Sequence, residues 1–213
     1  MPSQHASGRS MATPATDMVS QVPPWQAVLD FWFGASDAPE FGMARVEWFR
    51  KSDAFDEEIR SRFGPLHERA LDGALADWAA TPPGACALIV VLDQFSRNLY
   101  RGQAKAFAGD AQALAVAQRL VEAGDDQRLP TAQHRVFVYL PFEHDESLDS
   151  QQRSLALYER LAKASGLVDN LDYARKHAVI IERFGRYPHR NAALGRVSTP
   201  EEIEFLKQPG SSF

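Results

Sequence analysis

The feature that most constrains the fold is an uninterrupted apolar run at residues 85–92. The run follows Thr81 and two prolines. Threonine caps helices and proline is tolerated in a first helical turn, so we expect a helix from about Pro82 to Leu99. The first half of this helix is apolar on every side, and such a helix has no face suited to water. The sequence therefore predicts a central helix that is surrounded by the rest of the chain.

Helical spacing of apolar residues recurs along the rest of the chain, separated by glycine, proline and capping residues. The expected helix starts are Pro23-Pro24, Ser52-Asp53, Asp110, Thr131, Asn170 and Thr199, with a kink or break at Gly64-Pro65. No stretch alternates apolar and polar residues between hairpin turns, so we predict an all-α fold with no sheet. Short loops favour antiparallel helix hairpins, either bundled or stacked as in a solenoid, and no internal repeat is legible.

Length, charge and cysteine content define the class of protein. The chain of 213 residues has an ordinary globular composition, and we place one domain at residues 23–208, between a disordered tail at 1–22 and a C-terminal tail at 209–213. The net charge of −5 provides no positive field for nucleic acid or an anionic membrane. No stretch reaches the roughly 18 to 20 apolar residues of a membrane span. The single cysteine, Cys86, fits a reducing compartment, so we expect a cytoplasmic protein.

The second half of the expected central helix carries a polar row. Gln94, Arg97, Asn98 and Arg101 have the i, i+3, i+4, i+7 spacing of one helical stripe, and Asp93 precedes them. Burying charged groups without partners is costly, so enclosed groups have to pair with one another or face a pocket. The row therefore predicts either an ion-pair network or a site.

Two more polar segments follow apolar helices. One is the run 143–146, which contains Glu143 and His144; the other is the basic stretch 182–191, with His177 one to two turns upstream. A glycine and a proline in the basic stretch end one helix and start the next, so its cationic groups lie at a helix junction with unpaired backbone groups. Its candidate residues are Arg183, Arg186, His189, Arg190 and Asn191.

Opposite charges in these three segments support two interpretations. In one, arginines and carboxylates form a closed salt-bridge network that fixes helix packing and needs no ligand. In the other, they line a pocket for a small anionic molecule or a peptide end, because hydrogen-bonding groups exceed simple pairing and arginine offers a planar fork for carboxylate or phosphate. The predicted binding residues are Asp93, Gln94, Arg97, Asn98, Arg101, Arg183, Arg186, His189, Arg190 and Asn191.

Two alternative functions are a hydrolase and a protein-interaction scaffold, and each depends on a different feature of the chain. Glu143 with His144 or His177 is the candidate catalytic set of an acid/base or metal-assisted hydrolase, since a carboxylate beside an imidazole holds the pKa of the imidazole near neutrality. No HExxH or CxxC spacing appears, and we predict neither a metal nor a cofactor. A protein-interaction scaffold of the solenoid kind is a third alternative, and it predicts an exposed concave groove.

Three segments, LDQFSRN at 92–98, YLPFEHDE at 139–146 and RFGRYPHRN at 183–191, are followed by Leu194-Gly195-Arg196. In this order they resemble a bacterial family catalogued as domain of unknown function 924, over about Val28 to Leu206. The resemblance implies an α-helical fold like that of tetratricopeptide-repeat proteins, a right-handed helical array or bundle without a recognisable repeat consensus. It implies no established activity. Ser96 stands where the family commonly has proline, and this difference leaves the charged positions undisturbed.

Overall fold

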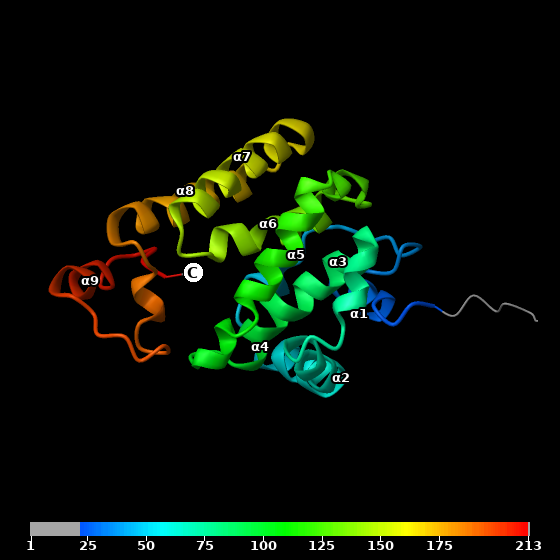
Figure 1. Cartoon of the computed structure of the whole chain (residues 1–213), viewed down its shortest axis with the longest axis horizontal. Coiled ribbons are helices and arrows are strands. Elements are labelled where there is room, and N and C mark those ends of the chain that lie inside the picture. The colour runs from blue at the N-terminus through cyan, green and yellow to red at the C-terminus, as the bar shows by residue number, and fades with distance from the viewer. Residues whose placement is uncertain (1–21, 213) are drawn as a thin grey trace, which may run out of the picture.

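Helices and their connections make up the described part of the chain. This computed structural model describes residues 22–212, in which no strand occurs, so the predicted all-α fold is confirmed. The expected tail lies outside the described residues except for Val22. The helices, shown in Figure 1, are α1 (Gln26–Phe33), α2 (Asp53–Leu71), α3 (Pro82–Ile89), α4 (Ser96–Leu99), α5 (Asp110–Glu122), α6 (Ala132–His144), α7 (Leu148–Ser165), α8 (Val168–Phe184) and α9 (Pro200–Phe205).

Three predicted helix starts carry the side-chain cap that the sequence indicates. The hydroxyls of Ser52, Thr81 and Thr199 accept hydrogen bonds from backbone N–H groups three residues on, at 3.2 to 3.3 Å. At Thr199 the carboxylate of Glu202 also accepts from the Thr199 N–H, which completes a capping box. Each such cap contributes about 1 kcal/mol to stability.

Three other predicted caps are absent. Asp110 and Asn170 lie inside the first turn of their helices, and Thr131 makes no capping hydrogen bond at the start of α6. Competing side-chain partners explain two of these cases. Thr131 Oγ1 lies 2.8 Å from Nδ1 of His134, and the Asp110 carboxylate binds an arginine outside its own helix. Asn170 misses the cap position because α8 already begins at Val168.

Of the kink or break expected at Gly64-Pro65, the break is absent, because α2 continues through Pro65. Proline removes one backbone donor from the helix and would destabilise an isolated one. Here the buried residues Phe63, His67 and Ala70 lie on both sides of Pro65. Tertiary packing of this apolar face contributes more to helix stability than local propensity does, so the helix persists.

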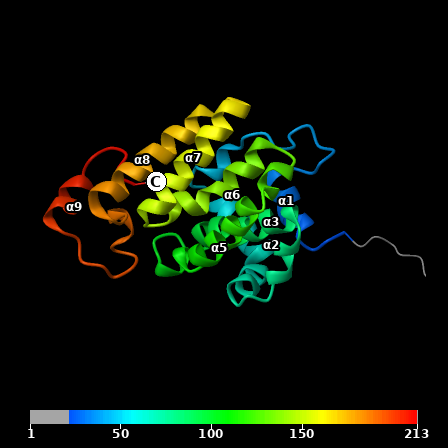
Figure 2. The same cartoon turned by 45° about the horizontal axis from the view of Figure 1, so that its top comes forward.

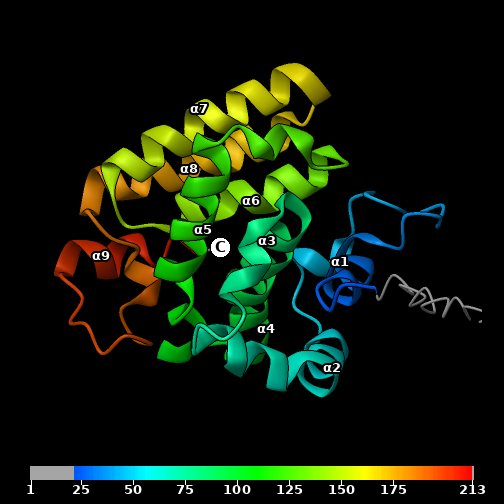
Figure 3. The ribbon, with the colours of Figure 1, turned by 45° about the vertical axis from the view of Figure 1, so that its right-hand side comes forward.

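The expected helix of residues 82–99 is surrounded, as predicted, but it is not regular. α3 contacts α1, α5 and α6 (Figure 3). Cys86 within α3 is fully buried. Residues Val90–Phe95 form a π-helical segment, η3, between α3 and α4. Single π-helical turns inside helices are rare and frequently occur at functional sites. The wider turn shifts the angular position of the residues after it, so predictions that assume one regular α-helix fail beyond it.

α7 and α8 form an antiparallel hairpin that packs against α6. Gly166 ends α7 in the left-handed conformation, with φ of 78°, and α8 begins two residues later. Figures 1 and 2 show α7 and α8 side by side, with α9 at the edge of the molecule near the end of α8. Within residues 22–212, no helix combines the length and the apolarity that crossing a membrane requires.

Candidate functional site

The π-helical segment places two polar side chains inside the protein. Asp93 has no exposed surface and Gln94 is 6% exposed. The Asp93 carboxylate is contacted by three donors: His144 Nδ1 at 2.7 Å, Gln94 Nε2 at 2.6 Å and Arg97 Nη1 at 2.9 Å. Although burial opposes ionisation, the charge of Arg97 and the hydrogen bonds from His144 and Gln94 hold the pKa of Asp93 below its usual range. Asp93 is therefore a buried carboxylate whose charge is compensated.

His144, the last residue of α6, is oriented by Asp93. Its Nδ1 donates to the carboxylate, so the lone pair of the neutral ring is on Nε2. Burial, followed by the charge of Arg97, lowers the pKa of His144, which keeps the ring neutral at pH 7. A carboxylate that fixes the tautomer of a neutral imidazole is the arrangement that general bases use.

Arg97 and Arg190 share the carboxylate of Asp110. Arg97 donates two hydrogen bonds to Asp110, at 2.9 and 3.1 Å, and Nη1 of Arg190 lies 3.3 Å from the same group. The sequence predicts only a helix cap at Asp110. No local signal could identify it as a partner, because Arg190 lies 80 residues away in the sequence.

Arg190 is buried with little compensation for its charge. Its side chain is 8% exposed, and the contact with Asp110 is the one hydrogen bond of its guanidinium to residues 22–212. Its Nε has no hydrogen-bond partner there, and the guanidinium carbon lies 4.7 Å from the ring centroids of both Phe107 and Tyr187. Burial, followed by the charge of Arg97, lowers the pKa of Arg190. Unused donors on a buried arginine cost free energy unless an acceptor is supplied.

Glu143 and His177 form a second carboxyl–imidazole pair. Nδ1 of His177 lies 3.1 Å from Glu143 Oε1 and 2.9 Å from the carbonyl oxygen of Tyr173. Because a carbonyl oxygen only accepts, Nδ1 carries the proton and donates to Tyr173, with Glu143 Oε1 beside it. Burial, followed by the charge of Asp93, raises the pKa of Glu143 to about 8, and burial lowers the pKa of His177 to about 3. At pH 7 the two side chains are therefore a neutral pair, with Glu143 protonated.

Two residues that the sequence analysis did not single out hold the end of α6. Nε2 of Gln151 donates to the carbonyls of Glu143 and Asp145, both at 2.8 Å, and the hydroxyl of Tyr187 also donates to the Glu143 carbonyl. These bonds satisfy carbonyls that a helix end leaves unpaired. They also fix the positions of Glu143 and His144. A glutamine inside the next helix carries no sequence signal for this role.

Asn98 and Arg101 face away from this group and bind Asp56 of α2. Asn98 Nδ2 donates to Asp56 at 2.7 Å, and Arg101 donates two bonds to it at 2.6 and 2.8 Å. Successive residues of a helix point about 100° apart, so Arg97 and Asn98 meet different neighbours. α4 also ends at Leu99, before Arg101. The predicted single stripe is therefore divided: Gln94 and Arg97 bind Asp93 and Asp110, whereas Asn98 and Arg101 bind Asp56.

A third group lies at the C-terminal end of the chain. The carboxylate of Glu202 accepts two bonds from Arg186, at 2.6 and 2.8 Å, and one from Asn191 at 3.3 Å. Arg183 pairs with Glu201 at 2.9 Å. We call Arg186, Asn191 and Glu202 the C-terminal cluster. We call the first group the central cluster; its members are Asp93, Gln94, Arg97, Asp110, Glu143, His144, His177 and Arg190.

The structure thus brings some predicted site residues together and separates others. His189 lies beside the central cluster, with its ring 5.5 Å from that of Tyr187. Burial, followed by the charge of Arg190, lowers the pKa of His189 to about 4. The central cluster and His189 include the three catalytic candidates and five of the ten binding candidates. The other five are Asn98, Arg101, Arg183, Arg186 and Asn191, which lie with Asp56 or near α9.

Two cavities of the structure lie outside the central cluster. One is lined by residues of α5, α6 and α7, and the other mainly by residues of α2, α3 and α5. No three His, Cys, Asp or Glu side chains in the described part of the chain are placed to hold a metal ion.

Comparisons with known proteins agree with this fold. The family model described as "Bacterial protein of unknown function (DUF924)" matches residues 28–210, so the chain belongs to this family. The chain is similar to a solved structure, titled "Structure of Protein of Unknown Function ATU0120 from Agrobacterium tumefaciens". The two are 39% identical with a TM-score of 0.74, over 86% of this chain and 96% of that chain. A search of curated proteins finds no match.

Proposed function

We propose that the central cluster binds a small anionic molecule, a carboxylate or a phosphate, through Arg190. The observation that carries this proposal is the poorly compensated burial of Arg190, whose guanidinium makes one hydrogen bond, at 3.3 Å, to residues 22–212 and whose Nε has no partner there. A ligand oxygen would satisfy donors for which the described residues supply no acceptor, and the planar guanidinium matches a carboxylate or phosphate edge. A peptide C-terminus offers the same chemistry.

The neighbours of Arg190 define the charge that such a ligand meets. Arg97 and Arg190 together carry two positive charges, and Asp93 and Asp110 carry two negative charges. His189 is neutral at pH 7, as its lowered pKa indicates. The competing interpretation is that Asp110 already serves as the internal anion, which leaves a closed ion-pair network. Under that interpretation added anions do not bind.

Thermal unfolding in the presence of anions separates the two interpretations. Inorganic phosphate and acetate are each compared with sodium chloride at equal ionic strength. At about 100 times the dissociation constant, a ligand that binds only the native state raises the melting temperature of a domain this size by about 5–10 °C. We expect Arg190→Met to abolish this rise and the exposed control Arg183→Gln to retain it. No rise beyond that in chloride, or an equal rise in Arg190→Met, overturns the proposal.

A second candidate function, acid/base catalysis, is favoured by the Asp93–His144 pair. His144 would act as the base through Nε2, and the protonated Glu143 would act as an acid. The test is a broad hydrolase substrate screen with metal analysis, carried out on the natural chain, Glu143→Gln and His144→Gln. Activity that both substitutions reduce about 100-fold or more supports this candidate, as general acid–base groups contribute about that much. An activity that neither substitution changes, or no activity with any substrate, counts against it.

A further inference from the structure

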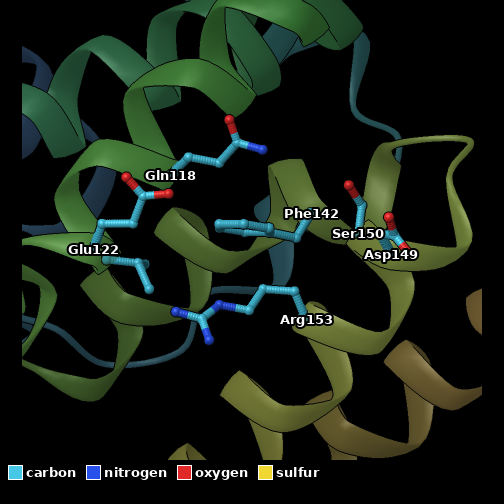
Figure 4. Close-up of a pocket in the computed structure, with 7 residues that line it drawn as sticks. Gln118, Glu122, Phe142, Asp149, Ser150 and Arg153 are labelled. Carbon is cyan, nitrogen blue, oxygen red and sulfur yellow. The ribbon is translucent and has the colours of Figure 1, made fainter.

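One of the two cavities outside the central cluster lies between α5, α6 and α7 and is lined mainly by polar residues. Its volume is about 330 Å³, within the range of small-molecule sites. Figure 4 shows the ring of Phe142 in the middle, Gln118 and Glu122 on one side of it and Arg153 on the other. Val121 also lines this cavity, and Val121 and Phe142 are the apolar part of its wall.

The charged residues of this cavity have no hydrogen-bond or ion-pair partners in the part of the chain that the structure describes. Glu122, Asp149 and Arg153 make no ion pair and no side-chain hydrogen bond to any residue in 22–212, and all three are exposed. In Figure 4, Glu122 and Arg153 lie on opposite sides of the Phe142 ring. Opposite charges held apart across an apolar surface are complementary to a ligand that carries both charges itself.

We infer that this cavity binds a free α-amino acid with an apolar side chain. The ammonium group would bind the carboxylate of Glu122, and the carboxylate group would bind the guanidinium of Arg153. The apolar side chain would pack against Val121 and Phe142, where it loses contact with water. A ligand with only one of the two charges would leave one wall of the cavity unpaired. This site is independent of the proposed anion site at Arg190.

Calorimetric titration with L-leucine and L-phenylalanine tests the inference. N-acetyl-L-leucine lacks the ammonium group and L-leucinamide lacks the carboxylate, and we expect each to bind at least about tenfold more weakly than L-leucine. The pattern in variants is specific. Glu122→Gln should bind L-leucine more weakly than the natural chain does, and with an affinity close to its affinity for N-acetyl-L-leucine. Arg153→Gln should bind L-leucine with an affinity close to its affinity for L-leucinamide.

Matched controls locate the site. Glu159→Gln and Lys163→Gln change exposed charges of α7 that do not line the cavity, and they should leave L-leucine binding unchanged. All titrations are repeated in Arg190→Met, because leucine carboxylates are also candidate ligands of the proposed anion site. The pattern expected for Glu122→Gln and Arg153→Gln should persist in that background. The inference is overturned if neither amino acid binds at millimolar concentration. It is equally overturned if Glu122→Gln and Arg153→Gln bind L-leucine, N-acetyl-L-leucine and L-leucinamide with the same affinities as the natural chain.

Discussion

The central cluster and the C-terminal cluster contain arginines four residues apart in one segment, yet these arginines are paired very differently. Arg186 makes two short hydrogen bonds to Glu202, although its side chain is 29% exposed. Arg190 is 8% exposed and makes one contact of 3.3 Å with Asp110, which Arg97 already binds more closely. The more deeply buried arginine is therefore the less well compensated one.

This difference separates a structural role from a binding role. The carboxylate of Glu202 accepts bonds from Arg186, Asn191 and the backbone N–H of Thr199, so its hydrogen-bonding capacity is used within the chain. Such a network fixes α9 against the end of α8 and has no evident need of a ligand. The central cluster has unused donors on Arg190, which motivates the proposed anion site.

The largest expected effect concerns the compensated part of the central cluster. Asp93→Asn removes a fully buried negative charge. The donors of Arg97 and His144 then no longer face an ionised carboxylate. Breaking a buried pair in this way costs about 3–5 kcal/mol of unfolding free energy. Urea denaturation measures the loss, and Asp53→Asn, whose side chain is 88% exposed, is the control. A loss below about 1 kcal/mol would contradict the view that Asp93 organises the cluster.

The two clusters should also respond to pH in opposite directions, since each contains a buried glutamate. The ordinary pKa is 4.5; burial raises the pKa of Glu143 to about 8, whereas the hydrogen bond from Arg186 lowers the pKa of Glu202 to about 2. The raised pKa of Glu143 contributes to the unfolding free energy, fully below pH 4.5, and this contribution is lost as pH rises to about 8. A lowered pKa gives stability present above pH 4.5 and lost as pH falls toward 2.

Urea titrations at several pH values test this contrast. Within its window, one such group changes the unfolding free energy by about 1.4 kcal/mol per pH unit. We expect Glu143→Gln to remove a decline in stability between pH 5 and 8, and Glu202→Gln to remove a decline between pH 4.5 and 2. If Glu143→Gln leaves the alkaline profile unchanged, Glu143 is not held protonated in the folded protein.

A smaller effect is expected for Arg190 itself. In Arg190→Met an apolar side chain replaces the guanidinium beside the rings of Phe107 and Tyr187, and Asp110 keeps its two bonds from Arg97. Replacing a poorly compensated buried charge by an apolar residue of similar volume is often nearly neutral, so we expect a change of about 1 kcal/mol or less. Arg186→Met should be more destabilising, because it leaves Glu202 without its closest donor. The reverse order in urea denaturation would remove the distinction between the clusters.

The predictable parts of this fold follow from local chemistry. The capping box at Thr199 and the apolar run around Cys86 depend on residues within one or two turns of each other, so the sequence predicts both features correctly. Pro65 is different, because the packing of Phe63 and His67 decides whether the helix continues. The π-helical segment at Val90–Phe95 also has no local sequence signal.

The site is less predictable because its partners are far apart in the sequence. Arg190 and Asp110 are 80 residues apart, and Arg101 and Asp56 are 45 apart. Any arginine of the three polar segments is compatible in sign with any of these carboxylates, so composition cannot assign the pairs. Burial decides between an ionised and a neutral carboxyl group, as in Glu143, and it depends on the completed fold.

The smallest expected effect is for Arg183, which lies in the same segment as Arg186 and Arg190 but pairs at the surface. The side chains of Arg183 and Glu201 are 46% and 63% exposed, and ion pairs this exposed contribute about 0.2–1 kcal/mol. Arg183→Gln should therefore change the unfolding free energy by less than about 1 kcal/mol in urea denaturation. The effect should shrink further in molar salt, which screens exposed pairs. A loss as large as that of Asp93→Asn would mean that burial does not distinguish the two clusters, and the argument for Arg190 as a ligand-binding residue would lose its basis.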